Sequence, residues 1–376
     1  MSIGAIPSQI IRQMIDVGHI KSRAGIADGQ IQPSSIDLTI SSKVVRLEGS
    51  FLPKEDEELA EILDELNAYE TVDSKRVIDL RKSPELERDA IYVAEVNETL
   101  RLPDYVYGYT NNKSSTGRIN LQTRTVSCGN SRFDKIKKGF RGKLYLEIIP
   151  KSFPVALSPG DSLNQMRLFT GDSVLSDLEL SIANEKYKIL YGKDGKPLDK
   201  KEAMIDKGLM MSVDLENDII GWKAKNCNKL VWLNRKDHYN FEDFWEPIKK
   251  PGNGRIFLKK GEFYIFSTRE YIRVPPVFAA EMVPYDVSSG EFRSHYAGFF
   301  DPGFGYGTNG EILGTPAVLE VIVYENDFIL RHGQPVCKMV FERLMAAPET
   351  IYGHNIHSHY QHQRGPKLSK HFKNET

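Results

Sequence analysis

The sequence is poor in cysteine and has no long apolar run, and both shortages narrow the classes of protein to which it can belong. Its three cysteines, Cys128, Cys227 and Cys337, are odd in number and far apart, which disfavours a disulfide framework. No apolar run approaches the roughly 18 residues that span a bilayer. The first residues also lack the basic and apolar regions of a signal peptide. We therefore expect a cytoplasmic protein.

An excess of charge of one sign is also missing. Lys and Arg number 50 and Asp and Glu number 51, so the formal net charge is −1. Such a balance gives no general attraction to DNA or to an anionic membrane, and we expect neither as a partner. Any phosphate binding must then come from a local cluster of side chains. The length of 376 residues is sufficient for two cores.

Four landmarks recur along the chain in the same order and at a nearly constant offset, which predicts two copies of one domain. The offsets are 212 − 35 = 177 for the Ser-x-Asp-Leu motifs, 288 − 114 = 174 for the serine pairs, 320 − 147 = 173 for the glutamates, and 333 − 160 = 173 for the glycines six residues before Met166 and Met339. Gly, Pro and charged residues predict a linker at 193–204, between domains 1–192 and 205–376.

Short apolar runs bounded by Pro and Gly, such as 90–94, 144–149, 263–266 and 318–324, predict a mainly β fold. We expect a mostly antiparallel sandwich or barrel in each half. Two helices are also expected. Residues 8–18 have apolar side chains at helical spacing, with Ser8 as a possible cap. Residues 55–66 carry four apolar positions on an acidic background, which favours a solvated insertion with one docked face.

The segment 113–118, Lys-Ser-Ser-Thr-Gly-Arg, is a candidate phosphate grip. The hydroxyls of Ser114 and Ser115 and the guanidinium of Arg118 can converge on phosphate oxygens, and Lys113 adds a point charge. Taken alone, the same residues also fit a capped turn with a surface arginine. The later motifs decide in favour of the functional interpretation.

A glutamate stands between apolar residues in one strand of each copy, Glu147 in the first and Glu320 in the second. A solvent-facing glutamate on a half-buried strand is the ordinary explanation. Its recurrence in both copies favours a buried carboxylate, whose raised pKa would suit acid–base chemistry near neutral pH. Two hairpin-like segments, 131–142 and 296–305, lie between these motifs and can present backbone groups to a nucleobase.

The order Ser-Ser-x-x-Arg, hairpin aspartate, Leu-Glu-[Ile/Val] and Pro-Gly-Asp-Ser-Leu-Asn-Gln-Met resembles the trimeric dUTPase and dCTP deaminase superfamily. Segments 31–38 and 359–369 resemble its deaminase branch, and the doubled length resembles a bacterial subgroup of dCTP deaminases. The resemblance implies two tandem dUTPase-like distorted β-barrel or jelly-roll domains with a few short helices. It also implies hydrolysis of dCTP to dUTP and ammonia for dTTP synthesis, by a homo-oligomer with trimeric or pseudo-threefold symmetry.

The resemblance assigns functions to individual residues of this chain. Mg²⁺ is expected on the substrate triphosphate, not in a protein cage. The implied catalytic residues are Glu147, Ser114, Arg118 and Glu320, and the implied substrate-binding residues are Lys113, Ser115, Arg132, Asp134, Asp301, Gln165, Tyr352, Tyr360 and Gln363, the last three in a segment that closes over the nucleotide.

Each copy departs from the family pattern in a different motif. The second serine pair at 288 is followed by an extra residue and by Glu291, which weakens it as a phosphate grip. The first copy has Leu190 where the closing segment needs glutamine. We therefore expect a composite site, with the phosphate grip from the first copy and the closing segment from the second. Either glutamate could be the acid–base, with a preference for Glu147.

Zinc is not expected in the catalytic site. Most nucleobase deaminases hold zinc with a motif that includes Cys-x-x-Cys, whereas the cysteines here are 227 − 128 = 99 and 337 − 227 = 110 positions apart. The histidines at 354, 357, 359 and 362 coincide with the closing segment and give no fixed metal geometry. Without metal, a glutamate must take a proton from water and deliver it to the leaving amine.

Two other functions remain open from the sequence. A dUTP diphosphatase, or a bifunctional enzyme that continues to dUMP, would use Asp134 or Asp301 to activate water for attack on phosphorus. A non-catalytic nucleotide-binding regulator would keep the fold without the chemistry. The strand glutamate in both copies favours deamination, because a pure diphosphatase does not need it.

Overall fold

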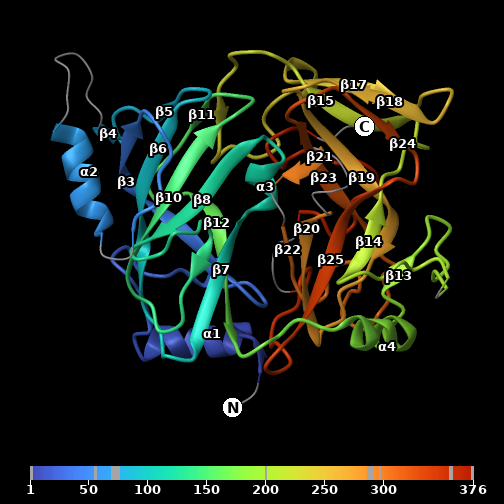
Figure 1. Ribbon diagram of the computed structural model, residues 1–376, viewed down its shortest axis with the longest axis horizontal. Coiled ribbons are helices and arrows are strands. Elements are labelled where there is room, and N and C mark those ends of the chain that lie inside the picture. The colour runs from blue at the N-terminus through green and yellow to red at the C-terminus, as the bar shows by residue number, and fades with distance from the viewer. Residues whose placement is uncertain are drawn as a thin grey trace.

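The computed structural model describes residues 3–54, 57–68, 77–199, 201–285, 292–295, 298–354 and 359–373, with the backbone alone for 66–68 and 292–295. Strands dominate it, as predicted, and the two halves of the chain lie side by side (Figure 1). The first half contains β1 Gly4–Ala5, α1 Ser8–Asp16, β2 Ile20–Ser22, a 3₁₀ turn Asp28–Gln30, β3 Ile36–Leu47, α2 Leu59–Ala68, β4 Val77–Asp79, β5 Glu85–Leu86, β6 Ile91–Arg101, β7 Val106–Asn112, α3 Ser114–Gly117, β8 Leu121–Ser127, β9 Lys135–Ile136, β10 Arg141–Pro150, β11 Val155–Ala156 and β12 Ser162–Thr170.

The second half begins with one helix, and strands make up most of the rest. It contains α4 Asp177–Tyr187, β13 Leu190–Tyr191, β14 Leu209–Ser212, β15 Ile219–Ala224, β16 Val231–Trp232, a 3₁₀ turn Phe241–Asp243, β17 Trp245–Lys249, β18 Arg255–Leu258, β19 Phe263–Ile272, β20 Phe278–Pro284, β21 Phe292–His295, β22 Phe299–Phe300, β23 Thr315–Val323, β24 Phe328–Arg331 and β25 Pro335–Arg343.

The named strands within each half pair in an antiparallel manner. The large sheet of the first half has the order β8-β10-β6-β3-β12-β7-β9, with β1, β2 and β4 at its sides. The second half has two main sheets, β17-β15-β19-β23-β21 and β14-β25-β20-β22, and a β18-β24 ribbon. The predicted repeat is visible in the backbone, since Glu147 and Glu320 occupy β10 and β23, and Gly160 and Gly333 both have positive φ, 89° and 72°.

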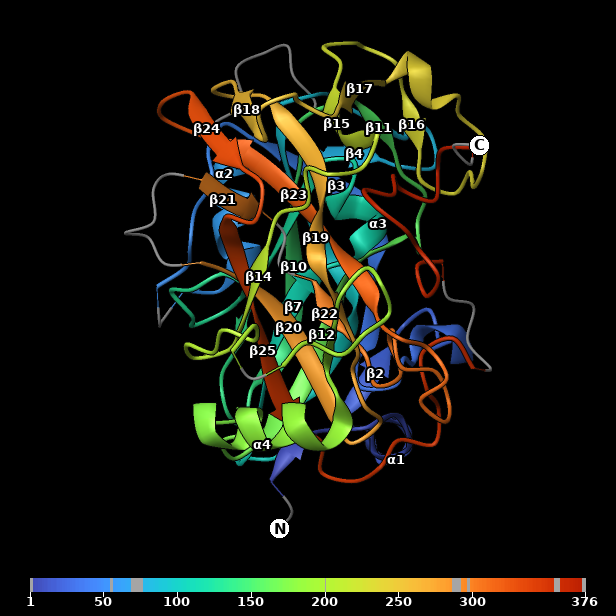
Figure 2. The ribbon, with the colours of Figure 1, turned by 90° about the vertical axis from the view of Figure 1, so that its right-hand side faces the viewer.

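The two halves share structure across their boundary. In a three-stranded sheet, β11 of the first half pairs in parallel with β16 of the second. The main core of the first half also includes Trp222, Trp245 and Val318 from the second. In the described chain, α4 packs in the second core and lies below β20 and β25 in Figure 2. The predicted domain boundaries and linker stay predictions.

The helices differ from the sequence prediction in detail. Helix α1 is confirmed, but its N-cap is Pro7, and Ser8 is its first residue. Helix α2 begins four residues later than predicted and buries Leu59 and Leu63 on its docked face. Helix α4 was missed, although Ser176 and Glu179 form a capping box that marks its start in the sequence.

Candidate active site

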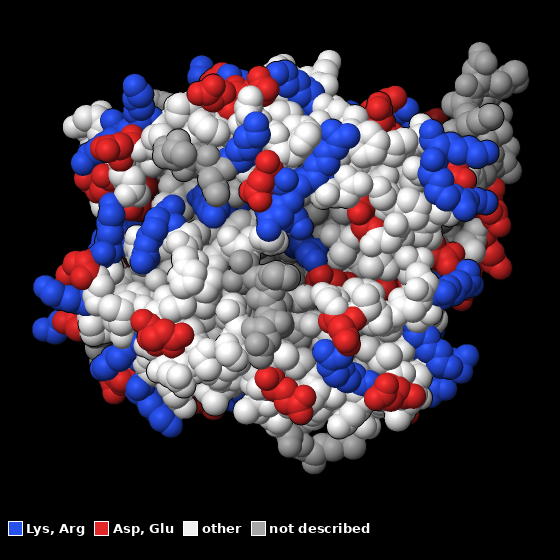
Figure 3. All heavy atoms as spheres, turned by 180° about the vertical axis from the view of Figure 1, so that it is seen from behind, with Lys and Arg blue, Asp and Glu red and all other residues white. Residues whose placement is uncertain are grey.

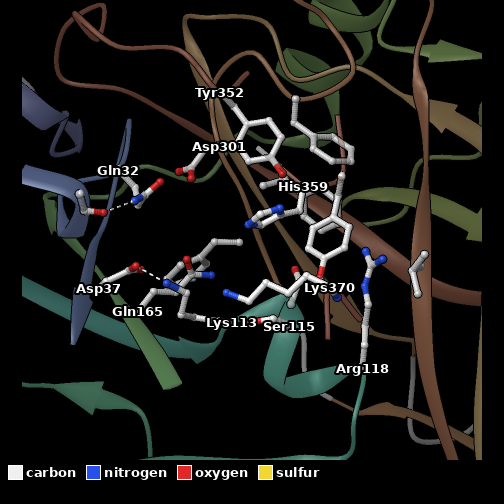
Figure 4. A pocket seen from close by; sticks show the side chains of 18 of the residues that line it. Gln32, Asp37, Lys113, Ser115, Arg118, Gln165, Asp301, Tyr352, His359 and Lys370 are labelled. Atoms are coloured by element: carbon white, nitrogen blue, oxygen red, sulfur yellow. Dashed lines mark hydrogen bonds and ion pairs between the residues drawn. The ribbon is translucent and has the colours of Figure 1, made fainter. Parts of the chain in front are cut away.

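A cavity of about 490 Å³ lies between the two halves and is lined by residues from both (Figure 4). Ten of the thirteen predicted site residues line it. From the first half these are Lys113, Ser114, Ser115, Arg118 and Gln165, and from the second half Asp301, Glu320, Tyr352, Tyr360 and Gln363. The structure thus brings the phosphate grip of the first copy and the closing segment of the second into one cavity.

Glu320 enters this cavity from β23, a central strand whose residues are all buried. Its side chain is 4% exposed, and burial raises the pKa of its carboxyl well above the ordinary value, while the nearby Arg118 opposes the rise. Helix α3 lies against this carboxylate, since a Cβ added to Gly117 would lie 3.1 Å from both carboxylate oxygens. The short helix therefore places the grip residues directly beside Glu320.

Arg118 is held by the C-terminal segment. One terminal nitrogen donates to the carbonyl oxygen of Lys367 at 2.9 Å, and the other donates to Gln363 Oε1 at 3.0 Å. The guanidinium carbon lies 3.8 Å from the centre of the Tyr360 ring, a cation–π contact. Gln363 also donates to the carbonyl oxygen of Pro316 at 2.6 Å. The segment predicted to close over the nucleotide therefore fixes the arginine of the grip.

The sequence assigns no function to two residues beside the grip, Asp37 and Lys370. Lys113 pairs with Asp37, whose pKa is raised by burial and lowered in part by that lysine. Lys370 also lines the cavity, and burial followed by repulsion from Lys113 lowers its pKa. Asp37 could have been found, because it belongs to the recurring Ser-x-Asp-Leu motif. Lys370 has no such signal, since only folding brings it to Lys113.

The hairpin aspartate Asp301 reaches the cavity from the opposite side to Arg118, next to Tyr352 (Figure 4). The turn after it is the predicted Asp-Pro-Gly turn. Gly303 has φ +98°, and a Cβ there would lie 1.9 Å from Ile351, so glycine is required. The backbone N–H of Tyr352 donates to the carbonyl oxygen of Pro302 at 2.8 Å, which ties the closing segment to this turn.

Three predicted residues do not line this cavity, and the preference for Glu147 is not supported there. Glu147 is 2% exposed and accepts two hydrogen bonds from Arg124, at 2.8 and 2.5 Å, so its carboxylate is already neutralised. Asp134 lines a separate polar hollow, where burial raises its pKa to about 6 and Thr110 donates to it at 2.9 Å. Arg132 is exposed.

Some predicted features fall on parts of the chain that the structure does not describe. Ser288 and Glu291 of the second serine motif, and His357, lie outside the described residues, as does the side chain of Arg293. Among the residues that are described, no three His, Cys, Asp or Glu side chains group closely enough to hold a metal ion. No helix in the described part is long and apolar enough to cross a membrane.

Basic side chains surround the approach to the site. A second hollow of about 270 Å³ shares His359, Tyr360, Gln363 and Lys370 with the cavity. Seen from behind, the molecule is hollowed near its centre, and lysine and arginine side chains gather along the upper edge (Figure 3). Further basic residues that line the second hollow are Lys236, Arg364, Lys367 and Lys373. The near-neutral chain therefore concentrates positive charge beside the cavity.

Comparison with known proteins agrees with this geometry. Residues 2–172 match the family model of the N-terminal domain of 2′-deoxycytidine 5′-triphosphate deaminase, and residues 184–372 match that of its C-terminal domain. The crystal structure of the 2′-deoxycytidine 5′-triphosphate deaminase from Agrobacterium tumefaciens superposes with a TM-score of 0.83 and 35% sequence identity, covering 92% of this chain and 100% of that chain.

Shorter relatives match part of the chain. The "dCTP deaminase, dUMP-forming" of Methanothermobacter thermautotrophicus is 30% identical over 182 residues, which are 46% of this chain and 83% of the relative. That of Methanobrevibacter smithii is 28% identical over 142 residues, 37% of this chain and 69% of the relative. With both family models matched and a full-length structural relative, the chain belongs to the dCTP deaminase family and is an enzyme that deaminates dCTP.

Proposed function

We propose that the enzyme releases dUTP and ammonia from dCTP, with Glu320 as the general base and acid. The observation that carries this proposal is the position of Glu320, buried in the composite cavity beside Arg118 and the serine pair. A carboxylate of raised pKa exchanges protons efficiently near neutral pH. Glu147 shares the sequence motif but is bound to Arg124 outside this cavity.

The proposed chemistry needs one water and no redox step. The water oxygen forms a bond to C4 of cytosine as Glu320 accepts a proton, and the C4–N bond breaks as a proton is delivered to the amine. The two water protons end on N3 of the base and on ammonia. Arg118, fixed by Gln363 and Tyr360, stabilises negative charge that develops on the base, and Ser114 or Ser115 orients the water.

The triphosphate is proposed to lie along Lys113 and Lys370 toward the basic hollow beside the C-terminal segment. Mg²⁺ would accompany the triphosphate, since this ion prefers phosphate oxygens and water to an all-protein cage. Catalysis without zinc, a cytoplasmic location and a closed homo-oligomer of trimeric or pseudo-threefold form are parts of the same proposal.

A second candidate is an enzyme that continues from dUTP to dUMP. The observation that favours it is the name of the shorter relatives, which are called "dCTP deaminase, dUMP-forming". This activity needs a second water to attack a phosphorus atom. Of the two aspartates that the sequence suggests for this step, Asp301 lines the cavity, whereas Asp134 lies in a different hollow.

Product analysis tests the proposal. Purified protein is incubated with dCTP and Mg²⁺, and nucleotides and ammonia are quantified over time. We expect dUTP and ammonia in equal amounts. Accumulation of dUMP and pyrophosphate instead of dUTP would establish the second candidate. Separate incubation with dUTP shows whether any dUMP arises by a second, independent step.

A further inference from the structure

The segment 225–244 of the second half lies between β15 and β17, the place that α2 has between β3 and β4 in the first copy. Its strand β16 pairs in parallel with β11 of the first half. Where this strand begins, the backbone N–H of Val231 donates to the carbonyl oxygen of Pro154 at 3.0 Å. The segment is therefore fixed to the half of the chain that supplies the phosphate grip.

The same segment holds the C-terminal end of the chain, which lies beside β16 in Figure 2. The backbone N–H of Tyr239 donates to the carbonyl oxygen of His371 at 3.1 Å. The carbonyl oxygen of Tyr239 accepts from the N–H of Lys373 at 2.9 Å. Between these bonds, Tyr239 and Phe372 form a parallel β-bridge. All of these bonds lie within the chain, so they do not require a nucleotide.

Aromatic packing adds to this attachment. The Phe372 side chain is 3% exposed and belongs to the main core of the first half. The centre of its ring lies 5.3 Å from that of Phe244 and 5.9 Å from that of Trp245. The Tyr239 ring lies 5.4 Å from Phe244, and its hydroxyl accepts from the Trp232 N–H at 2.8 Å. Because burial of such rings removes apolar surface from water, we expect this end of the chain to be ordered in the free enzyme.

The attached end carries groups that reach the cavity. Ser369 donates to the carbonyl oxygen of Ser115 in the grip at 2.8 Å. Lys370 lines the cavity and lies close enough to Lys113 for their charges to repel. Tyr239 lines neither the cavity nor the basic hollow beside it, so it can act on the site only through these neighbours.

We propose that Tyr239 is a positioning residue that keeps residues 369–373 docked before the substrate binds, so that Ser369 and Lys370 already meet the grip in the free enzyme. This inference rests on the proposed function, which places dCTP in the same cavity. A segment that becomes ordered only on binding lowers affinity by the cost of its ordering, and prior docking avoids that cost. Loss of the Tyr239 side chain should therefore weaken substrate binding more than it slows the chemical step.

The kinetics of three variants test this function. Tyr239→Ala removes the ring, and we expect KM for dCTP to rise about tenfold while kcat stays within about threefold of wild type, because the bound state keeps the same arrangement. Tyr239→Phe keeps the ring and should hold KM within about twofold of wild type. Phe241→Ala is the matched control and should also leave KM within about twofold, since Phe241 is half-buried in the same segment and its ring packs 5.2 Å from that of Trp222.

Residue-resolved hydrogen exchange gives a readout that does not depend on activity. In the wild-type protein without nucleotide, we expect the amide of Lys373 to exchange slowly, and dUTP to change its rate less than about twofold. In Tyr239→Ala this amide should exchange at least about tenfold faster, and dUTP should restore part of its protection.

Two results would overturn the proposal. One is fast exchange of the Lys373 amide in free wild-type protein that slows only with dUTP, a measurement that needs no variant to fold. The other is an equal rise in KM for Tyr239→Ala and Phe241→Ala. Wild-type protein that forms no dUTP from dCTP would instead overturn the proposed function, and exchange without nucleotide would still report the docking, so the two failures are distinguishable.

Discussion

Glu147 and Glu320 stand in the same sequence motif but in different chemical surroundings. Across the strands, Glu147 on β10 lies opposite Arg124 on β8, which neutralises it. Glu320 faces the cavity and Gly117, which has no side chain. The neighbouring elements therefore give the two glutamates different surroundings, an arginine for Glu147 and the cavity for Glu320.

Replacement of the two glutamates tests this difference. Glu320→Gln should lower kcat for dCTP deamination by about 10²–10⁴-fold, because the amide cannot accept the water proton, while Kd for dCTP changes little. Glu147→Gln is the matched control and should keep kcat within about threefold of wild type, with any loss appearing in stability. Steady-state kinetics and calorimetric binding provide the readout. Equal losses of kcat in both variants would refute the assignment.

The raised pKa of Glu320 has a consequence for stability. A carboxyl whose folded-state pKa lies above its unfolded value destabilises the fold once it ionises, so the penalty grows as pH rises from about 4.5 through the folded pKa. Glu320→Gln should therefore raise the thermal midpoint at pH 8 by about 1–3 °C and have no effect near pH 4. Melting curves across this pH range measure it. A constant difference at all pH values would exclude titration as its cause.

Helix α3, four residues long, brings the serine pair close to Glu320. Its first residues supply the serine pair, and its last residue, Gly117, leaves room for the Glu320 carboxylate. The backbone of Gly117 is not in the positive-φ region, so the close contact with Glu320, and not backbone strain, disfavours a larger residue there. Ser369 donates to the carbonyl oxygen of Ser115 at 2.8 Å and ties the C-terminal segment to the same helix.

Alanine at position 117 tests that fit. The new Cβ would lie 3.1 Å from the Glu320 carboxylate and displace it. We expect Gly117→Ala to lower kcat about tenfold and to leave stability unchanged or raised by about 0.5 kcal/mol, since alanine favours a helix. Gly252→Ala, where an added Cβ meets nothing within 4 Å, is the control for kcat. Full activity of Gly117→Ala would show that Glu320 moves freely.

At the scale of the whole molecule, the two halves are joined by one apolar interior. Trp222 and Trp245 come from the second half, yet both are buried in the main core of the first. The candidate cavity lies at the same boundary and is lined by the serine pair of the first half and Glu320 of the second. Separation of the halves would therefore expose apolar surface, and the same step would disrupt the cavity.

Unfolding should accordingly be a single cooperative transition. Tryptophan fluorescence reports Trp222, Trp232 and Trp245, and far-UV circular dichroism reports strands of both halves. We expect the two signals to give coincident urea curves, and loss of deaminase activity to follow the same curve. Two separated transitions would mean that the halves unfold independently despite the shared core.

The cavity within one chain also predicts the outcome of a mixing experiment. Arg118→Ala and Glu320→Gln chains, differently tagged and co-expressed, should stay inactive after purification through both tags, because no chain keeps both residues. If cavities formed between neighbouring chains, mixed oligomers would regain a measurable fraction of wild-type activity. A single chain with both substitutions provides the baseline.

Local sequence patterns determined the fold class, the repeat and several motifs of this protein. The β-rich halves, the repeat and the residues of the grip follow from short motifs, since turn chemistry and strand alternation act over a few residues. The departures of each copy from the motif pattern also predicted that residues of both halves would meet, and they line one cavity. Helix α4 had a capping signal that was overlooked, and α2 was placed too early because helix ends depend on tertiary contacts.

Only the tertiary structure decided which glutamate faces the cavity. Glu147 and Glu320 have nearly identical neighbours in sequence, and their difference lies in Arg124 and Gly117, which reach them from other elements. The same holds for Lys370 beside Lys113, and for Arg167 and Ser34 on Asp301. Such contacts join residues far apart in the chain, so they depend on how strands of the two halves pack, which no local pattern encodes.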